Sequence, residues 1–127
     1  MVVGIGNDII EVARFVRPID NDRFLRRCFT DKERDTVQSG GNRVARFAGR
    51  FAAKEAVVKA MGTGFLGFWP CEVEIGTEPN GRPSVRLHGK AAQLAAARGI
   101  TQWEVSISHC RTHATAVALA LAPSVPA

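Results

Sequence analysis

The sequence predicts an α+β fold in which a mainly antiparallel sheet packs on one long helix. Two observations lead to this prediction. The first is the order of the predicted elements, which is a strand, three helices, a hairpin, a helix and two final strands. The second is the stretch 43–64, which is rich in Ala, Arg, Lys and Glu and contains no proline. It is long enough for the other elements to pack around it.

The first predicted strand, residues 2–12, is rich in Val and Ile. Alternation along the strand places Gly4, Gly6 and Asp8 on one face, where Asp8 carries the only charge. The two glycines leave room for another group to approach the backbone closely. Asp8 therefore either ends the strand and caps the next segment, or contributes to a cation site.

A short helix is predicted at about residues 20–28, with Asn21 or Asp22 near its start. Arginines are concentrated in and just before this helix, at Arg14, Arg17, Arg23, Arg26 and Arg27. Such a cluster is commonly a solvated helix face, but it also suits an anionic partner.

Capping signals mark the next two helices. Thr30 and Glu33 form a capping box for a helix over residues 31–38. Asn42 is expected to cap the start of the long helix, and Gly62 is expected to end it in a left-handed conformation.

One carboxylate stands out in the long helix. The core-facing residues predicted from helical spacing are Val44, Phe47, Phe51 and Val58. Glu55 falls in the same stripe, where a carboxylate is costly unless it is paired or bound to a cation. Lys59 lies one turn further on, so the alternatives are a surface Glu55–Lys59 pair or, together with Asp8, a Mg²⁺ site.

The second half of the chain supplies most of the predicted strands. Residues 63–70 form an unusually apolar loop, expected to fold back on the domain or on a neighbour. The elements that follow are a hairpin at 71–76 and 83–87, a helix at 90–98, and strands at 103–108 and 112–121. Residues 1–122 are expected to form a single domain, and 123–127 a flexible tail.

Composition narrows the classes of function. Seventeen Lys and Arg residues against twelve Asp and Glu residues give a net charge of +5, which suggests an anionic partner. Aromatic residues are not interleaved with the basic ones as a base-stacking surface requires, so nucleic acid is not expected. The three cysteines match no zinc spacing or disulfide framework. The apolar runs are too short to cross a bilayer and no secretory segment follows Met1, so a cytoplasmic protein is expected.

Three segments carry the unusual polar residues. The N-terminal strand contains G-I-G-N-D and is followed by Arg14; Arg50 begins the run R-F-A-A-K-E-A-V-V-K-A; and S-I-S-H ends at His109. In order and spacing these segments closely resemble the bacterial holo-acyl-carrier-protein synthases, which are 4'-phosphopantetheinyl transferases. The resemblance covers essentially the whole chain, and the R-F-A-A-K-E-A-x-x-K run is its most specific part.

The resemblance implies a fold and an activity. The fold would be that of the 4'-phosphopantetheinyl transferases. The enzyme would move the phosphopantetheine arm of coenzyme A onto a serine of an apo acyl carrier protein, for fatty-acid or polyketide synthesis, and release adenosine 3',5'-bisphosphate. Asp8 and Glu55 would hold the required Mg²⁺, and Lys59 would contact the phosphates. The general base stays open between Glu55 and a water molecule whose pKa the cation lowers.

The resemblance also implies binding partners and an assembly. The positions that match coenzyme A contacts are Arg50, Lys59, Gly62, Ser108 and His109. For His109 the alternative is a structural histidine at the end of a strand. Carrier proteins of this class are acidic, so Arg14, Arg23, Arg26 and Arg27 would dock them. Short-chain members of the family are trimers with active sites between subunits. The competing hypothesis is a non-catalytic basic module that binds nucleic acid or another anionic partner.

Overall fold

The structure of the chain, a computed structural model, describes residues 1–124 and confirms the predicted α+β architecture. The strands are β1 (Val2–Glu11), β2 (Val73–Thr77), β3 (Pro83–Leu87), β4 (Gln102–His109) and β5 (His113–Leu121). The α-helices are α1 (Asp22–Cys28), α2 (Asp31–Gln38), α3 (Arg43–Met61) and α4 (Gly89–Ala97). Short 3-10 helices are η1 (Val12–Phe15), η2 (Pro18–Asp20) and η3 (Pro70–Glu72).

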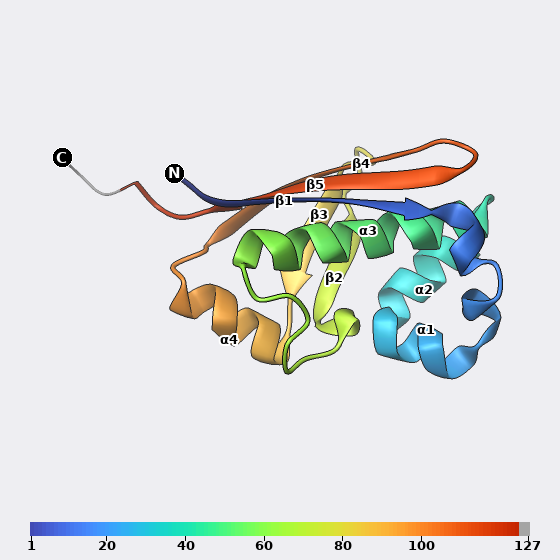
Figure 1. Cartoon of the computed structure of the whole chain (residues 1–127), viewed down its shortest axis with the longest axis horizontal. Coiled ribbons are helices and arrows are strands. Elements are labelled where there is room, and N and C mark those ends of the chain that lie inside the picture. The colour runs from blue at the N-terminus through green and yellow to red at the C-terminus, as the bar shows by residue number, and fades with distance from the viewer. Residues whose placement is uncertain (125–127) are drawn as a thin grey trace.

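The described strands form two antiparallel sheets. One is three-stranded, in the order β1-β5-β4, and the other is the hairpin β2-β3. Figure 1 shows α3 running along β1 and β5, with α1, α2 and α4 on the side of the helix away from that sheet. The three-stranded sheet therefore packs on the long helix, as predicted, and the other helices lie on the far side of α3.

Small residues bring α3 unusually close to the sheet. The residues of β5 that face the helix are alanines, and all are buried: Ala114, Ala116, Ala118 and Ala120. On β1 a Cβ added to Gly4 would lie 2.0 Å from the carbonyl oxygen of Ala60, and one added to Gly6 would lie 2.0 Å from that of Ala56. Only glycine fits at these two strand positions, because the helix backbone occupies the space of a side chain.

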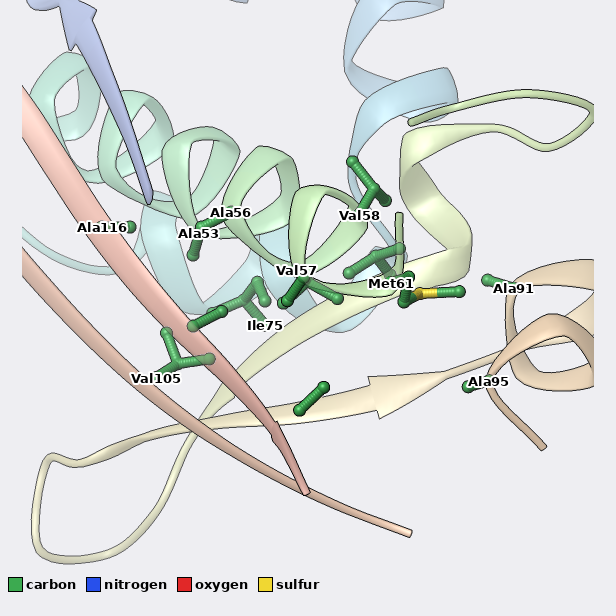
Figure 2. Close-up of a cluster of buried hydrophobic side chains, with 14 of the residues drawn as sticks. Ala53, Ala56, Val57, Val58, Met61, Ile75, Ala91, Ala95, Val105 and Ala116 are labelled. Atoms are coloured by element: carbon green, nitrogen blue, oxygen red, sulfur yellow. The ribbon is translucent and has the colours of Figure 1, made fainter. Parts of the chain in front are cut away.

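The other side of α3 packs on the hairpin and on α4. Figure 2 shows Val57 and Met61 of α3 beside Ile75 of β2 and Ala91 of α4, and all four are buried. This layer forms the larger hydrophobic core and fixes the hairpin against the helix.

The predicted apolar stripe of α3 describes only part of its contacts. Phe47 and Val58 are buried as expected, whereas Val44 and Phe51 are half-buried. The prediction counted large side chains, but the face toward the sheet consists of alanines, which pack closely without giving a strong periodic signal.

The capping predictions for the two short helices are confirmed. The Asn21 side chain accepts a hydrogen bond from the Phe24 backbone nitrogen at 3.0 Å, so α1 begins one residue later, at Asp22. Thr30 and Glu33 form the reciprocal capping box of α2.

The two ends of α3 differ in how well they were predicted. Gly62 ends the helix in the left-handed region with φ of 77°, as expected. Asn42 was expected to cap the start through its side chain, and this is wrong. Its backbone is left-handed with φ of 53°, a conformation that Asn tolerates, and its side chain makes no capping hydrogen bond.

The apolar loop after α3 is only partly folded back. Phe68 is buried and Phe65 is half-buried against Phe51, but Leu66 and Trp69 are exposed. Within residues 1–124 no helix combines the length and the apolar character needed to cross a membrane. Of the predicted tail 123–127, positions 125–127 lie outside the described residues.

Candidate active site

Asp8 lies on the face of β1 that packs against α3. The two glycines before it let the strand touch the helix backbone, so the Asp8 side chain is held close to α3 and is 16% exposed. Partial burial of a carboxylate is unfavourable without a positive partner. The structure supplies one from the helix.

Lys59 is that partner. Its Nζ donates to Asp8 Oδ1 at 3.1 Å and to the carbonyl oxygen of Asn7 at 3.0 Å. Lys59 therefore forms its ion pair with Asp8, which joins α3 to β1, and not the predicted alternative, a surface pair with Glu55. The Lys59 side chain is still 51% exposed, so its ammonium group is accessible from solvent.

Glu55 lies one helical turn before Lys59, on the same side of α3, and is half-buried. Its pKa is raised, first by burial and then by the negative charge of Asp8, while Lys59 acts in the opposite direction. The two carboxyl groups are thus close enough to repel each other. This is the arrangement that a bound cation relieves.

This donor set fits Mg²⁺ better than a softer metal. Two carboxylates are sufficient protein ligands for Mg²⁺, which leaves its other positions to water and to phosphate oxygens. Among residues 1–124 no three His, Cys, Asp or Glu side chains gather into a larger metal cluster.

Arg50 and His109 meet on a different side of α3. Both line a cleft of about 290 Å³ between the helix, the β2-β3 hairpin and the end of β4. Arg50 Nη2 donates to Thr77 Oγ1 at 2.9 Å, while its Nε is buried with no acceptor among the described residues. Burial, followed by the charge of Arg46, lowers the pKa of Arg50. The cleft is therefore lined by a cationic side chain that has one unsatisfied donor, which suits an anion.

Ser108 does not share the cleft of its neighbour His109. It lines a hollow of about 540 Å³ together with Asp8, Lys59 and Ser106, on the outer face of the three-stranded sheet. Consecutive residues of a strand point to opposite faces, so Ser108 and His109 are assigned to separate groups. Gly62 lines neither hollow, although its backbone nitrogen donates to the carbonyl oxygen of Lys59 at 3.0 Å.

The predicted site residues thus form two groups within one chain. Arg50 and Lys59 are nine residues apart on α3, which places them on opposite sides of the helix and about 14 Å apart along its axis. The first group is Asp8, Glu55 and Lys59, hereafter the carboxylate group, and Ser108 lines the hollow that reaches it. The second is Arg50 and His109, hereafter the arginine cleft.

The predicted docking arginines are all exposed. Arg14 follows β1 in η1, and Arg23, Arg26 and Arg27 lie on α1. Arg26 pairs with Asp22 at 3.1 Å, and the Arg27 guanidinium lies 4.9 Å from the ring centre of the exposed Trp69. A larger hollow of about 790 Å³ reaches Arg26 but contains neither Asp8 nor Arg50.

One buried ion pair had no predicted role. Lys54 in α3 and Glu33 in α2 are almost completely buried and lie 2.8 Å apart. The sequence indicated Glu33 only as part of a capping box. A usable signal was present, because Lys54 stands among alanines that face the core.

Cys110 is a distinctive thiol next to the arginine cleft. It is exposed in the turn after β4, and hydrogen bonding, chiefly from the Thr112 side chain, lowers its pKa to about 7. Burial instead raises the pKa of Cys28 to about 11 and also raises that of Cys71.

We expect Cys110 to react selectively with iodoacetamide at neutral pH. Its rate should rise through a midpoint near pH 7, because the thiolate is the reactive form. Peptide mass mapping over a pH series measures this, and Thr112→Val should move the midpoint upward. Equal labelling of the three cysteines at pH 7 would contradict the expectation.

Comparison with known proteins gives a consistent match. The sequence model of the 4'-phosphopantetheinyl transferase superfamily matches residues 4–119. The holo-acyl-carrier-protein synthase of Koribacter versatilis is 48% identical over 91% of this chain and 95% of its own. The crystal structure of the synthase from Neisseria meningitidis superposes with a TM-score of 0.87 at 31% identity, covering 95% of this chain and 99% of that one. The structure of the Bacillus anthracis synthase in complex with CoA (3',5'-ADP) superposes with a TM-score of 0.79 at 32% identity. The match covers 97% of this chain and 99% of that one.

Proposed function

The chain belongs to the 4'-phosphopantetheinyl transferase superfamily, and from this premise we propose how its residues carry out the reaction. It transfers the 4'-phosphopantetheine group of coenzyme A to a serine of an apo acyl carrier protein and releases adenosine 3',5'-bisphosphate. The alternative of a non-catalytic basic module is not supported by these relatives. The single observation that carries the proposed mechanism is the convergence of Asp8, Glu55 and Lys59.

Asp8 and Glu55 are proposed to hold a Mg²⁺ ion between β1 and α3. Their mutual repulsion, which contributes to the raised pKa of Glu55, supports this assignment. When bound, the ion neutralises charge on the diphosphate of coenzyme A. The two carboxylates would hold the ion between β1 and α3, next to the exposed Lys59.

Lys59 is proposed to stabilise the leaving group. Its ammonium now lies on Asp8, but the side chain is half-exposed and has several rotatable bonds. When Asp8 binds the ion instead of Lys59, the Lys59 ammonium can turn to a phosphate oxygen. There its charge stabilises the negative charge that grows on adenosine 3',5'-bisphosphate as the bond to phosphorus breaks.

The proton of the carrier serine must leave as its Oγ bonds to phosphorus. In this step the new serine–phosphorus bond forms, the phosphorus–oxygen bond of the diphosphate breaks, and the proton passes to a base. Glu55 is the candidate in this chain, because a raised pKa makes a carboxylate a better proton acceptor. A water molecule beside it is the second candidate.

Arg50, His109 and Ser108 are proposed to bind coenzyme A. The arginine cleft offers the Arg50 guanidinium and the His109 ring to a phosphate at the nucleotide end. Ser108 lines the hollow that also reaches Asp8 and Lys59. Gly62 is proposed to contribute through its backbone at the end of α3, beside Lys59.

A second copy of the chain is proposed to join the two groups into one site. Large apolar residues are exposed on the outer face of the three-stranded sheet, namely Val3, Ile5, Ile9 and Val117. An exposed apolar face of this kind is typical of a subunit interface. The hollow that reaches Asp8 opens on this face, so a neighbouring copy could bring its arginine cleft to it. We therefore propose a homotrimer with its active sites between subunits.

The exposed arginines of η1 and α1 are proposed to dock the acidic carrier. We expect replacement of Arg23, Arg26 and Arg27 by Ser to lower the association rate about tenfold to a hundredfold at low salt, because exposed charges act mainly through steering. Stopped-flow measurement against salt concentration checks this. The triple variant should lose most of the salt dependence seen in the wild type, with little change in coenzyme A binding. An unchanged association rate would contradict the docking role.

The cellular setting is also a proposal. The holo carrier produced would serve fatty-acid or polyketide synthesis in the cytoplasm. The names of the relatives, which are acyl-carrier-protein synthases, support an acyl carrier protein as the acceptor.

A mass measurement tests the metal requirement. Apo acyl carrier protein is incubated with the enzyme and coenzyme A, with Mg²⁺ or with a chelator in excess, and weighed. With Mg²⁺ the carrier should gain the mass of one phosphopantetheine group, and with the chelator it should not. Full modification in the presence of the chelator would overturn the metal assignment.

A further inference from the structure

Lys54 and Glu33 form a buried network that joins four elements. Lys54 Nζ donates to Glu33 Oε1 at 2.8 Å, to the Val73 carbonyl oxygen at 2.5 Å and to the Pro70 carbonyl oxygen at 3.2 Å. All three ammonium protons therefore have acceptors. The network links α2, α3, η3 and the start of β2.

Glu33 completes the network from the other side. Its Oε1 also accepts from the backbone nitrogen of Thr30 at 2.9 Å, and its Oε2 accepts from that of Ile75 at 2.9 Å. Glu33 is 2% exposed and Lys54 is 0% exposed. Lys54 Nζ also lies 5.2 Å from the ring centre of Phe29.

Such a pair is weak evidence for stability. Removing two charges from water costs several kcal/mol each, and apolar residues of similar volume are often equally stable in their place. Burial lowers the pKa of Lys54, and the Glu33 carboxylate opposes this effect. A contribution other than stability is therefore the better explanation for this pair.

The network holds the helix and strand that frame the proposed coenzyme A site. Lys54 precedes Glu55 directly on α3. On the partner element, Ile75 is two residues before Thr77, whose hydroxyl accepts from Arg50 across the arginine cleft. A shift between α3 and β2 would therefore open or close the cleft at the Arg50–Thr77 contact.

We propose that Lys54 and Glu33 are a positioning pair, which sets the separation of α3 and β2 and so holds the arginine cleft in its binding geometry. The inference rests on the proposed role of that cleft in binding coenzyme A. Neither residue touches the reacting atoms, because both are enclosed by the protein.

The test replaces the whole pair by apolar residues of similar volume, Glu33→Leu with Lys54→Met. The double variant should unfold at a denaturant midpoint near that of the wild type. Its dissociation constant for coenzyme A, measured by calorimetry without a carrier, should rise on the order of tenfold to a hundredfold because the cleft is displaced. The KM for the carrier, which docks elsewhere, should stay within about twofold. A control in the same helix, Asp31→Asn, changes a carboxylate that is 90% exposed and should alter none of these values.

The possible outcomes separate the two proposals. If the stable double variant binds coenzyme A as tightly as the wild type, the positioning role is wrong. If the wild type itself binds coenzyme A but Arg50→Ala binds equally well, the proposed function of the cleft fails instead. If the double variant does not fold, Glu33→Gln, which keeps the size of the side chain, is measured at a temperature where it is folded. A wild-type affinity in that variant would also overturn the positioning role.

Discussion

Replacing Glu55 by Gln is expected to lower turnover by a factor on the order of a thousand while the protein stays folded. The amide keeps the size of the side chain but provides a weaker ligand for Mg²⁺ and cannot accept the serine proton. Steady-state assays with coenzyme A and apo carrier measure the loss. Glu78→Gln, a matched change in the turn between β2 and β3, serves as the control and should leave turnover unchanged.

Folding of the Glu55→Gln variant should not suffer. The folded-state pKa of Glu55 is raised, so its folded form favours the protonated carboxyl. The stability that comes from this preference is present below the unfolded pKa and is lost as the pH rises through the folded pKa. At neutral pH the variant lacks the repulsion between Glu55 and Asp8, so it should unfold at or above the wild-type temperature. Normal turnover in this variant would remove both the metal role and the base role of Glu55.

Replacing Gly6 by Ala is expected to destabilise the fold by about 3 kcal/mol or more. The new Cβ would lie 2.0 Å from the carbonyl oxygen of Ala56 and 2.8 Å from the backbone nitrogen of Ala60. These are helix backbone atoms that cannot rotate away, so β1 must separate from α3. The same movement would carry Asp8 away from Glu55 and weaken Mg²⁺ binding. Denaturant unfolding and Mg²⁺ titration measure the two effects.

The control for this substitution is Gly41→Ala. A Cβ added at Gly41 meets no atom within 4 Å, and its φ lies outside the left-handed region. Its stability should change little or increase slightly, because alanine reduces the freedom of the unfolded chain. If Gly6→Ala were as stable as Gly41→Ala, the close contact between β1 and α3 would not limit the fold.

Local rules predicted much of this fold. The Thr30–Glu33 capping box, the Asn21 cap and the Gly62 termination were readable because each depends on residues a few positions apart. Asn42 was misjudged because an asparagine before a helix suggests side-chain capping, whereas its backbone adopts the left-handed form. The difference depends on the approach of the preceding turn, which no local pattern records.

Long-range pairing was predicted less well. The sequence put Asp8 and Glu55 on core-facing surfaces, and in the structure the charge of Asp8 contributes to the raised pKa of Glu55. It did not indicate that Lys59 would pair with Asp8, since that contact depends on the register of β1 against α3. Lys54 was missed because its partner Glu33 is 21 residues away, and the capping box already explained Glu33.

The separation of Ser108 from His109 was available in principle. Adjacent residues in a strand face opposite sides of a sheet, so the side chains of Ser108 and His109 could be assigned to different faces from the sequence. The structure places Ser108 with Asp8 and Lys59, and places His109 with Arg50. This division is the strongest reason to place the active site between subunits.

Complementation between two inactive variants tests that division most directly. Asp8→Asn lacks the carboxylate group and Arg50→Ala lacks the arginine cleft, so each chain alone should leave an apo carrier unmodified. When the two variants are co-expressed with different tags and purified as mixed oligomers, some interfaces combine one intact group from each chain. The carrier mass should then show phosphopantetheine addition at a clear fraction of the wild-type rate. If mixed oligomers form and the carrier stays unmodified, both groups must come from the same chain, and the site between subunits would be contradicted.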